Sequence, residues 1–143
     1  MLVYLAAVIP MPGESFVSQF QRDPNMYRPD FPGKDPTKDR ALAREYLFHY
    51  CSPDVTGWAL STLRLMFAKQ ALVEKSRLSA WPVTPSSYIS CSGDGALNPD
   101  WWERAARERL GTEPIRIQAG HAPHESRPAE LAALLHSLVL RHY

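Results

Sequence analysis

Several features are scarce in this sequence of 143 residues, and each scarcity excludes a class of protein. Only two cysteines occur, so there is no disulfide framework, and we expect Cys51 and Cys91 to be free thiols of a cytoplasmic protein. The net charge of +1 offers no basic surface for nucleic acid and no polybasic membrane anchor. The apolar N-terminal run stops at Pro10, far short of the ~20 residues that span a membrane. No basic stretch precedes that run, as it would in a signal peptide.

Proline, by contrast, is abundant, with 13 prolines against 7 glycines. Its share of about 9% is nearly twice the usual ~5%, and so many interruptions exclude a long-helix bundle or a coiled coil. Apolar residues make up 45% of the chain and charged residues 22%, which is enough to build a hydrophobic core. The length suits one domain or a piece of a larger domain.

Hydrophobic runs and helix-start signals alternate along the chain. Continuous apolar residues at 2–9 predict a strand covered on both faces, and further strands are predicted at 88–91 and 114–119. A capping residue, a proline or an acid predicts helices that begin near residues 38, 53, 99 and 128, of which the second extends to about residue 67. The proline-rich residues 21–37 predict an irregular segment. This order favours an α/β protein with a parallel sheet.

Two polar residues stand where strands of this sheet are predicted to end. Asp94 follows the second strand, and His121 follows the third. The carboxyl ends of adjacent parallel strands meet at one edge of a sheet, where ligand sites of α/β proteins lie. An Asp beside a His fixes the imidazole tautomer and stabilises the imidazolium that forms when the His accepts a proton. A turn former at Asp94 and a structural histidine are the alternative interpretation.

Other residues are weaker candidates for chemistry. Ser15 lacks the strand–turn–helix context that exposes a nucleophile, and Cys91 is expected to pack as a small hydrophobic residue. His121 and His124 suggest a zinc site only weakly, because Pro123 separates them and no other ligand cluster is present. We therefore expect neither a metal nor a cofactor.

Four segments resemble the α/β-hydrolase superfamily. Residues 88–99 (YISCSGDGALNP) resemble its acid-bearing strand and turn, and residues 119–123 and 126–131 resemble its histidine loop and final helix. Residues 3–7 and 11–15 resemble the strand after the nucleophile helix. Residues 48–53 (FHYCSP) resemble the cap of the esterase branch near plant methylesterases and hydroxynitrile lyases. The resemblance covers nearly the whole chain.

The resemblance implies a partial α/β-hydrolase fold, with about three parallel strands, flanking helices and a helical cap excursion at roughly 16–80. It implies Asp94 as the triad acid and His121 as the triad base of a carboxylic ester hydrolase. The family's nucleophile lies on a Gly-x-Ser-x-Gly elbow, and that motif is absent from the sequence. Residues 1–143 are therefore expected to be a C-terminal portion of the domain that is inactive by itself. Ala122 stands where lyase relatives carry a lysine, which disfavours lyase chemistry.

The apolar residues of the second predicted helix allow two interpretations. They form helix core, or they belong to a cap over a substrate pocket, and both can hold together. The set comprises Trp58, Leu63, Met66 and Phe67. The expected partners are a small-molecule ester and a complementing N-terminal half, without nucleic acid or membrane. The alternative function is a non-catalytic remnant or association module that forms a homodimer through the open edge of its first strand.

Overall fold

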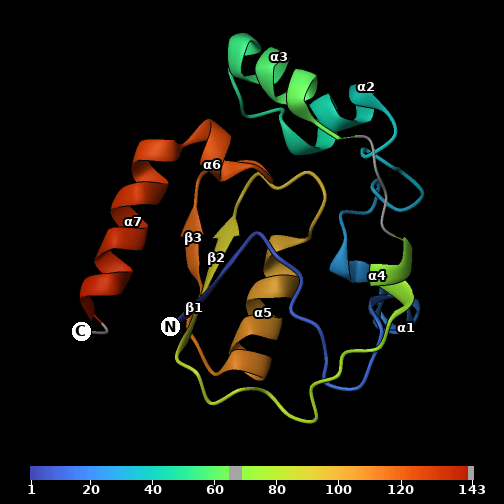
Figure 1. Ribbon diagram of the computed structural model, residues 1–143, viewed down its shortest axis with the longest axis vertical. Helices are drawn as coiled ribbons and strands as arrows, with labels where there is room; N and C mark the ends of the chain where they lie inside the picture. Colours follow the sequence, from blue (N-terminus) through green and yellow to red (C-terminus); the bar gives the residue numbers. More distant parts are fainter. Residues whose placement is uncertain (65–68, 142–143) are drawn as a thin grey trace.

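The computed structural model describes residues 1–64 and 69–141. Its centre is a three-stranded parallel sheet in the order β1 (Leu2–Leu5), β2 (Ser86–Cys91) and β3 (Ile115–Ile117), as Figure 1 shows. The register places Tyr4 beside Tyr88 and Ile89 beside Ile115. The predicted α/β class with parallel strands is therefore confirmed.

The first strand is shorter than the run of residues 2–9 predicts. It ends at Leu5 because the next residue, Ala6, adopts a φ of 41°, which turns the chain out of the sheet. The Ala6 N–H still donates to the carbonyl of Ile89 across a distance of 2.9 Å. The third strand is also shorter than predicted and covers only 115–117.

Two long helices cover the two faces of the sheet, α5 (Pro99–Leu110) and α7 (Pro128–Arg141), as Figure 1 shows. Because side chains alternate along a strand, Tyr88 packs with Trp102 of α5, whereas Ile89 packs with Leu131 of α7. The sheet thus has a hydrophobic core on each face.

The sequence explains both ends of α5. The side chain of Asn98 accepts a hydrogen bond from the Trp101 N–H, and Pro99 occupies the first helical position. Gly111 ends the helix with a φ of 62°, a left-handed conformation that glycine adopts at little cost. These boundaries agree with the helix predicted after residue 98.

The long connection, residues 6–85, joins β1 to β2 and contains only short helices: α1 (Phe16–Arg22), the 3₁₀ helix η1 (Pro24–Met26), α2 (Arg40–Leu42), the π-helical turn η2 (Ala43–Leu47), α3 (Pro53–Thr62) and α4 (Lys69–Val73). The prediction of an irregular 21–37 missed η1, and α1 was not predicted. The helix predicted to reach residue 67 ends at Thr62, so Met66 and Phe67 lie outside it and outside the described residues.

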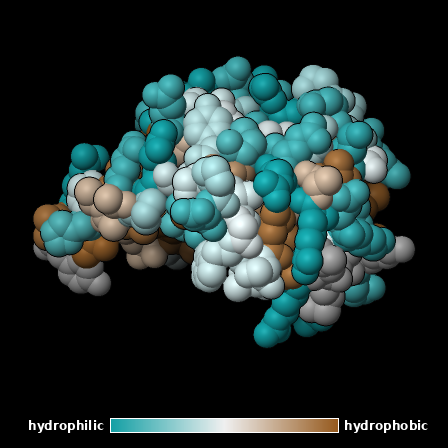
Figure 2. Space-filling model, turned by 90° about the horizontal axis from the view of Figure 1, so that it is seen from above, coloured by the Kyte–Doolittle hydropathy of each residue, from teal (hydrophilic) through white to brown (hydrophobic). Residues whose placement is uncertain are grey.

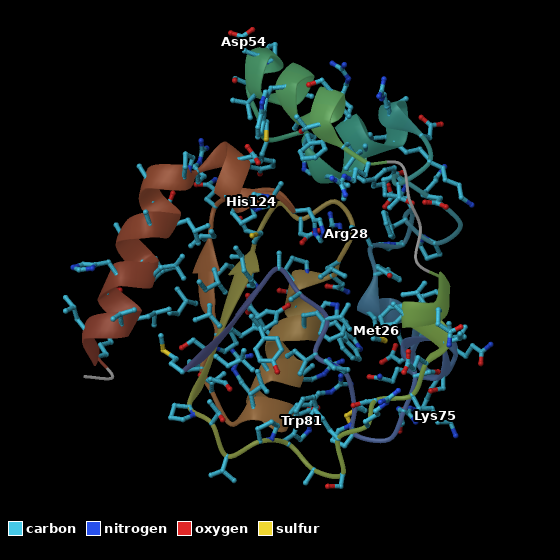
Figure 3. All side chains as sticks on the ribbon, viewed as in Figure 1. Met26, Arg28, Asp54, Lys75, Trp81 and His124 are labelled. Carbon is cyan, nitrogen blue, oxygen red and sulfur yellow. The ribbon has the colours of Figure 1, made fainter. Side chains whose placement is uncertain are left out.

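Hydrogen bonds fasten the long connection to the turn after β2. The Arg28 N–H donates to the Ala96 carbonyl at 2.9 Å, and the Asn98 N–H donates to the Met26 carbonyl at 3.0 Å. The indole N–H of Trp102 donates to the same Met26 carbonyl at 2.8 Å. Figure 3 shows Met26 in the segment that faces α5. These bonds hold the long connection beside the carboxyl end of the sheet.

The face seen from above, on the side of α3, is mostly hydrophilic, as Figure 2 shows. Over the two described ranges, no helix combines the length and apolar character that a membrane span requires. A short helix, α6 (Pro123–Ser126), follows β3 and precedes α7 at this end of the molecule (Figure 1).

Candidate active site

The structure brings Asp94 and His121 together at the carboxyl end of the sheet. The turn after β2 carries Asp94, and the loop after β3 carries His121. The Nδ1 atom of His121 lies 2.9 Å from Oδ2 of Asp94, which is hydrogen-bond distance. The parallel register of β2 and β3 therefore sets the spacing of the pair.

The Asp94 carboxylate is buried, with 3% of its surface exposed, and it is fully engaged. Its other oxygen, Oδ1, accepts hydrogen bonds from the backbone N–H groups of Ala96 at 2.8 Å and Leu97 at 2.9 Å. These bonds fix the turn and aim Oδ2 at the imidazole. The turn-forming role and the partnership with His121 thus coexist in one residue.

An ionised carboxylate only accepts hydrogen bonds, so the imidazole proton lies on Nδ1 of His121. The unprotonated Nε2 atom is then available to accept a proton from a hydroxyl group. Among the described residues, no group hydrogen-bonds to that atom. His121 also lines a cavity, so its imidazole is accessible from the space where a ligand would lie.

Three glycines around the pair let residues 46–50 approach closely. A Cβ atom at Gly93 would lie 2.4 Å from the Tyr50 ring, and one at Gly95 would lie 2.8 Å from a backbone carbonyl oxygen. A Cβ atom at Gly120 would lie 3.2 Å from Cβ of Tyr50. In addition, Nε2 of His49 lies 2.8 Å from the Gly93 carbonyl oxygen and therefore donates its proton there. Residues 46–50 thus rest directly on both loops.

Burial makes the neighbouring hydroxyl and thiol poor nucleophiles. Burial, followed by the charge of Asp94, raises the pKa of the Cys91 thiol to about 12, so the thiolate does not form near neutral pH. The same two causes raise the pKa of Tyr88, whose hydroxyl donates to the Ala7 carbonyl at 2.9 Å. Cys91 packs in the core on the α7 face, as a small hydrophobic residue would.

Ser15 serves as a helix cap. Its hydroxyl oxygen accepts a hydrogen bond from the Ser18 N–H at 3.1 Å and so begins α1. Within the two described ranges, no group of three or more His, Cys, Asp or Glu residues that could hold a metal ion is found. His124 lies on α6, as Figure 3 shows, and its Nε2 atom is 3.8 Å from Oε1 of Glu125.

A cavity of about 600 Å³ lies beside His121. Its wall is mainly apolar and comes mostly from the long connection. It includes four aromatic residues, Phe16 and Phe20 from α1 and Tyr27 and Phe31 from the segment after it. Sequence reasoning missed these residues. Their signal was weak, because the i, i+4 spacing of Phe16 and Phe20 marks one helix face but not what that face covers.

Of the residues expected in the cap, the structure describes Trp58 and Leu63. Trp58 does not pack in a core, because it points to solvent from α3 and is 57% exposed. Leu63 caps the end of α3 and packs against the small core that contains Phe48 and Leu60. Neither residue lines the cavity beside His121. Met66 and Phe67 are outside the described residues.

The fold agrees with comparisons to known proteins. Residues 2–134 match the model of the alpha/beta hydrolase family, and the chain belongs to that family. The match confirms the resemblance on which the sequence interpretation depends. It is supported by the alpha/beta hydrolase nvfD of Aspergillus novofumigatus, which is 30% identical over 135 residues.

Solved structures share the fold at low sequence identity. Polyneuridine aldehyde esterase matches with a TM-score of 0.72 and 18% identity over 96% of this chain. The methylesterase MES16 from Arabidopsis matches with a TM-score of 0.68 and 16% identity, also over 96% of this chain. The chain spans 52% of nvfD, 61% of the polyneuridine aldehyde esterase chain and 58% of the MES16 chain. It therefore covers only part of each relative's length.

Proposed function

We propose that this chain supplies the acid and the histidine of a serine ester hydrolase. The observation that carries the proposal is the 2.9 Å contact between His121 and the buried Asp94 at the carboxyl ends of adjacent strands. The structural relatives, an esterase and a methylesterase, support an ester as the substrate. Two free cysteines suit the reducing environment of the cytoplasm.

The proposed reaction needs a serine from a segment outside residues 1–143. Nε2 of His121 takes the serine proton while the serine oxygen attacks the ester carbonyl, and Asp94 stabilises the imidazolium. The histidine then returns the proton to the alcohol as the tetrahedral intermediate collapses to an acyl-enzyme. Water, activated by the same histidine, releases the acid. The donors that stabilise the oxyanion would also come from outside this chain.

The test is reconstitution with a segment that carries a Gly-x-Ser-x-Gly elbow, followed by an assay of p-nitrophenyl acetate hydrolysis. His121→Ala is expected to lower kcat by about 10³-fold or more. His124→Ala is the matched control, because that side chain is 60% exposed and lies three residues away. Equal losses in the two variants, or activity that survives His121→Ala, would contradict the proposal.

The second candidate function is an association module, favoured by the state of β1. This strand is an edge of the sheet, and all four of its residues are apolar or aromatic, yet none of them is buried. The Leu2 N–H donates to the carbonyl of Pro85, just before β2, and the Ala6 N–H donates to the carbonyl of Ile89 within β2. The alternate residues Val3 and Leu5 therefore direct their backbone N–H and C=O groups away from β2. Such an edge can pair with another strand.

The two candidates differ in what occupies this edge. Sedimentation equilibrium of the chain alone is expected to show a dimer. Addition of the complementing segment is expected to convert the dimer into a one-to-one complex, since one edge cannot serve both partners. A dimer that persists unchanged in the presence of the complementing segment would favour the association module over the hydrolase.

A further inference from the structure

A second cavity adjoins the one beside His121. The second cavity has a volume of about 490 Å³. Val8, Phe16, Tyr27 and Leu72 line both cavities, so the two cavities share part of their walls. Leu72 belongs to the short helix α4, which packs against α1. Either volume is within the ~300–1,000 Å³ range of small-molecule sites.

The aromatic rings of the first cavity contact one another, and two of them, Phe16 and Tyr27, also line the second cavity. The Tyr27 ring lies 5.7 Å from that of Phe16, 5.4 Å from that of Phe20 and 4.9 Å from that of Phe31, measured between centroids. Rings at these distances and tilted angles support one another and present edges and faces to a ligand. A ring-bearing ligand gains from such pairing beyond the apolar area that it buries.

We propose that the ester taken by this site carries a rigid, apolar, multi-ring group that extends from His121 through the first cavity, past Leu72 and into the second. The inference rests on the proposed hydrolase function, because His121 marks the reacting end. A rigid ring system loses little conformational freedom on binding, whereas a linear chain loses more and gains no ring pairing.

The carboxylates at the two cavities are paired within the protein, and the first cavity also carries the cation of Lys34. In the first cavity, Asp35 is held by Thr37 and Lys38, which together keep its pKa below the usual range despite some desolvation. In the second, Glu14 is paired with Arg22 at 2.6 Å. Lys75 lies on the outer side near α4, as Figure 3 shows, so polar substituents would be accepted at the far end of the ligand.

The test measures binding, which does not need the nucleophile. The probe is the methyl ester of pyrenebutyric acid, followed by its own fluorescence, with methyl decanoate and methyl benzoate as competitors. The chain is expected to bind the pyrene ester with a Kd about 10-fold lower than that of methyl decanoate. His124→Ala, at a residue that lines neither cavity, is expected to bind all three esters as the unaltered chain does. Binding that persists while reconstituted hydrolysis fails would thus sink the proposed function and leave this inference intact.

Two matched variants locate the ligand. Leu72→Trp adds bulk where the two cavities share a wall and is expected to raise the Kd of the pyrene ester about 10-fold without affecting methyl benzoate. Val73→Trp is the control, because Val73 is the exposed neighbour on α4. Equal effects of the two tryptophans would overturn the inference.

A second variant removes ring pairing without adding bulk. Phe31→Leu is expected to raise the Kd of the pyrene ester about 3-fold and to leave methyl decanoate unchanged. Circular dichroism verifies that each variant is folded. If Leu72→Trp is not folded, the binding data for Phe31→Leu test the inference in its place. Equal affinity of the unaltered chain for the pyrene ester and methyl decanoate, or no binding of either, would overturn the inference.

Discussion

Residues 86–141 and the long connection, residues 6–85, hold their shapes by different means. The first region contains the two longest helices, and local signals such as Asn98, Gly111 and Pro128 mark their ends. The long connection contains short helices that depend on contacts with distant parts of the chain. An example is the Met26 carbonyl, which accepts hydrogen bonds from the Asn98 N–H and from the indole N–H of Trp102.

This difference separates the two parts of the candidate site. The acid and histidine stand on loops whose spacing follows from the sheet, so a local pattern identifies them. The aromatic wall of the cavity is positioned by contacts between elements far apart in sequence. Asp94 and His121 are therefore expected to tolerate changes in the long connection outside residues 46–50 better than the cavity does.

The largest effect is expected where the two regions are joined. Trp102→Ala removes a side chain with no exposed surface and breaks its bond to the Met26 carbonyl, so the free energy of unfolding should fall by about 3–5 kcal/mol. Trp58→Ala, on the exposed face of α3, should change it by less than about 0.5 kcal/mol. Urea unfolding measures both values. Similar losses would mean that the regions do not depend on Trp102 for their attachment.

A smaller effect on the free energy of unfolding is expected at two glycines, and its sign should differ between the crowded Gly95 and the open Gly57. Gly95→Ala would place a Cβ atom 2.8 Å from the backbone carbonyl oxygen of Tyr46 and should cost about 1–3 kcal/mol of stability. Gly57→Ala, within α3, meets no atom within 4 Å and should add about 0.5–1 kcal/mol. Thermal unfolding gives the two signs. A stabilising Gly95→Ala would show that residues 46–50 do not rest on the Asp94 turn.

The smallest effect concerns the polar cluster between α5 and the sheet. Burial opposes the ionisation of Glu103, but hydrogen bonds from Arg116 and Ser90 outweigh it and hold the pKa of Glu103 below its usual range. A lowered folded-state pKa contributes stability above the unfolded value, and this contribution is lost as the pH falls below about 5. Glu103→Gln should cost about 1 kcal/mol at pH 7 and flatten the acid limb of the stability curve.

Glu113→Gln is the control for that measurement. Glu113 pairs with Arg107 at the surface and is 76% exposed, so its loss should barely alter the pH dependence. Urea unfolding between pH 3 and 7 compares the two variants. An acid limb that is equally steep in Glu103→Gln and in the unaltered chain would assign the pH dependence to other carboxylates.

The same contrast determines what the sequence could predict. The parallel sheet, α5, α7 and the positions of Asp94 and His121 follow from apolar runs, helix caps and strand ends. The end of β1 at Leu5 could not be predicted, because the positive φ of Ala6 leaves no mark in an unbroken apolar run. The aromatic wall escaped prediction because its rings come together only through contacts between separate elements. Trp58 was misplaced because hydrophobicity alone does not tell which face of a short helix is covered.

The contact of residues 46–50 with both loops of the candidate site has a mechanical consequence. Tyr50 touches the positions of Gly93 and Gly120, and His49 holds the Gly93 carbonyl. The two loops therefore share one support, and a displacement of that support is felt by the acid and the histidine at the same time.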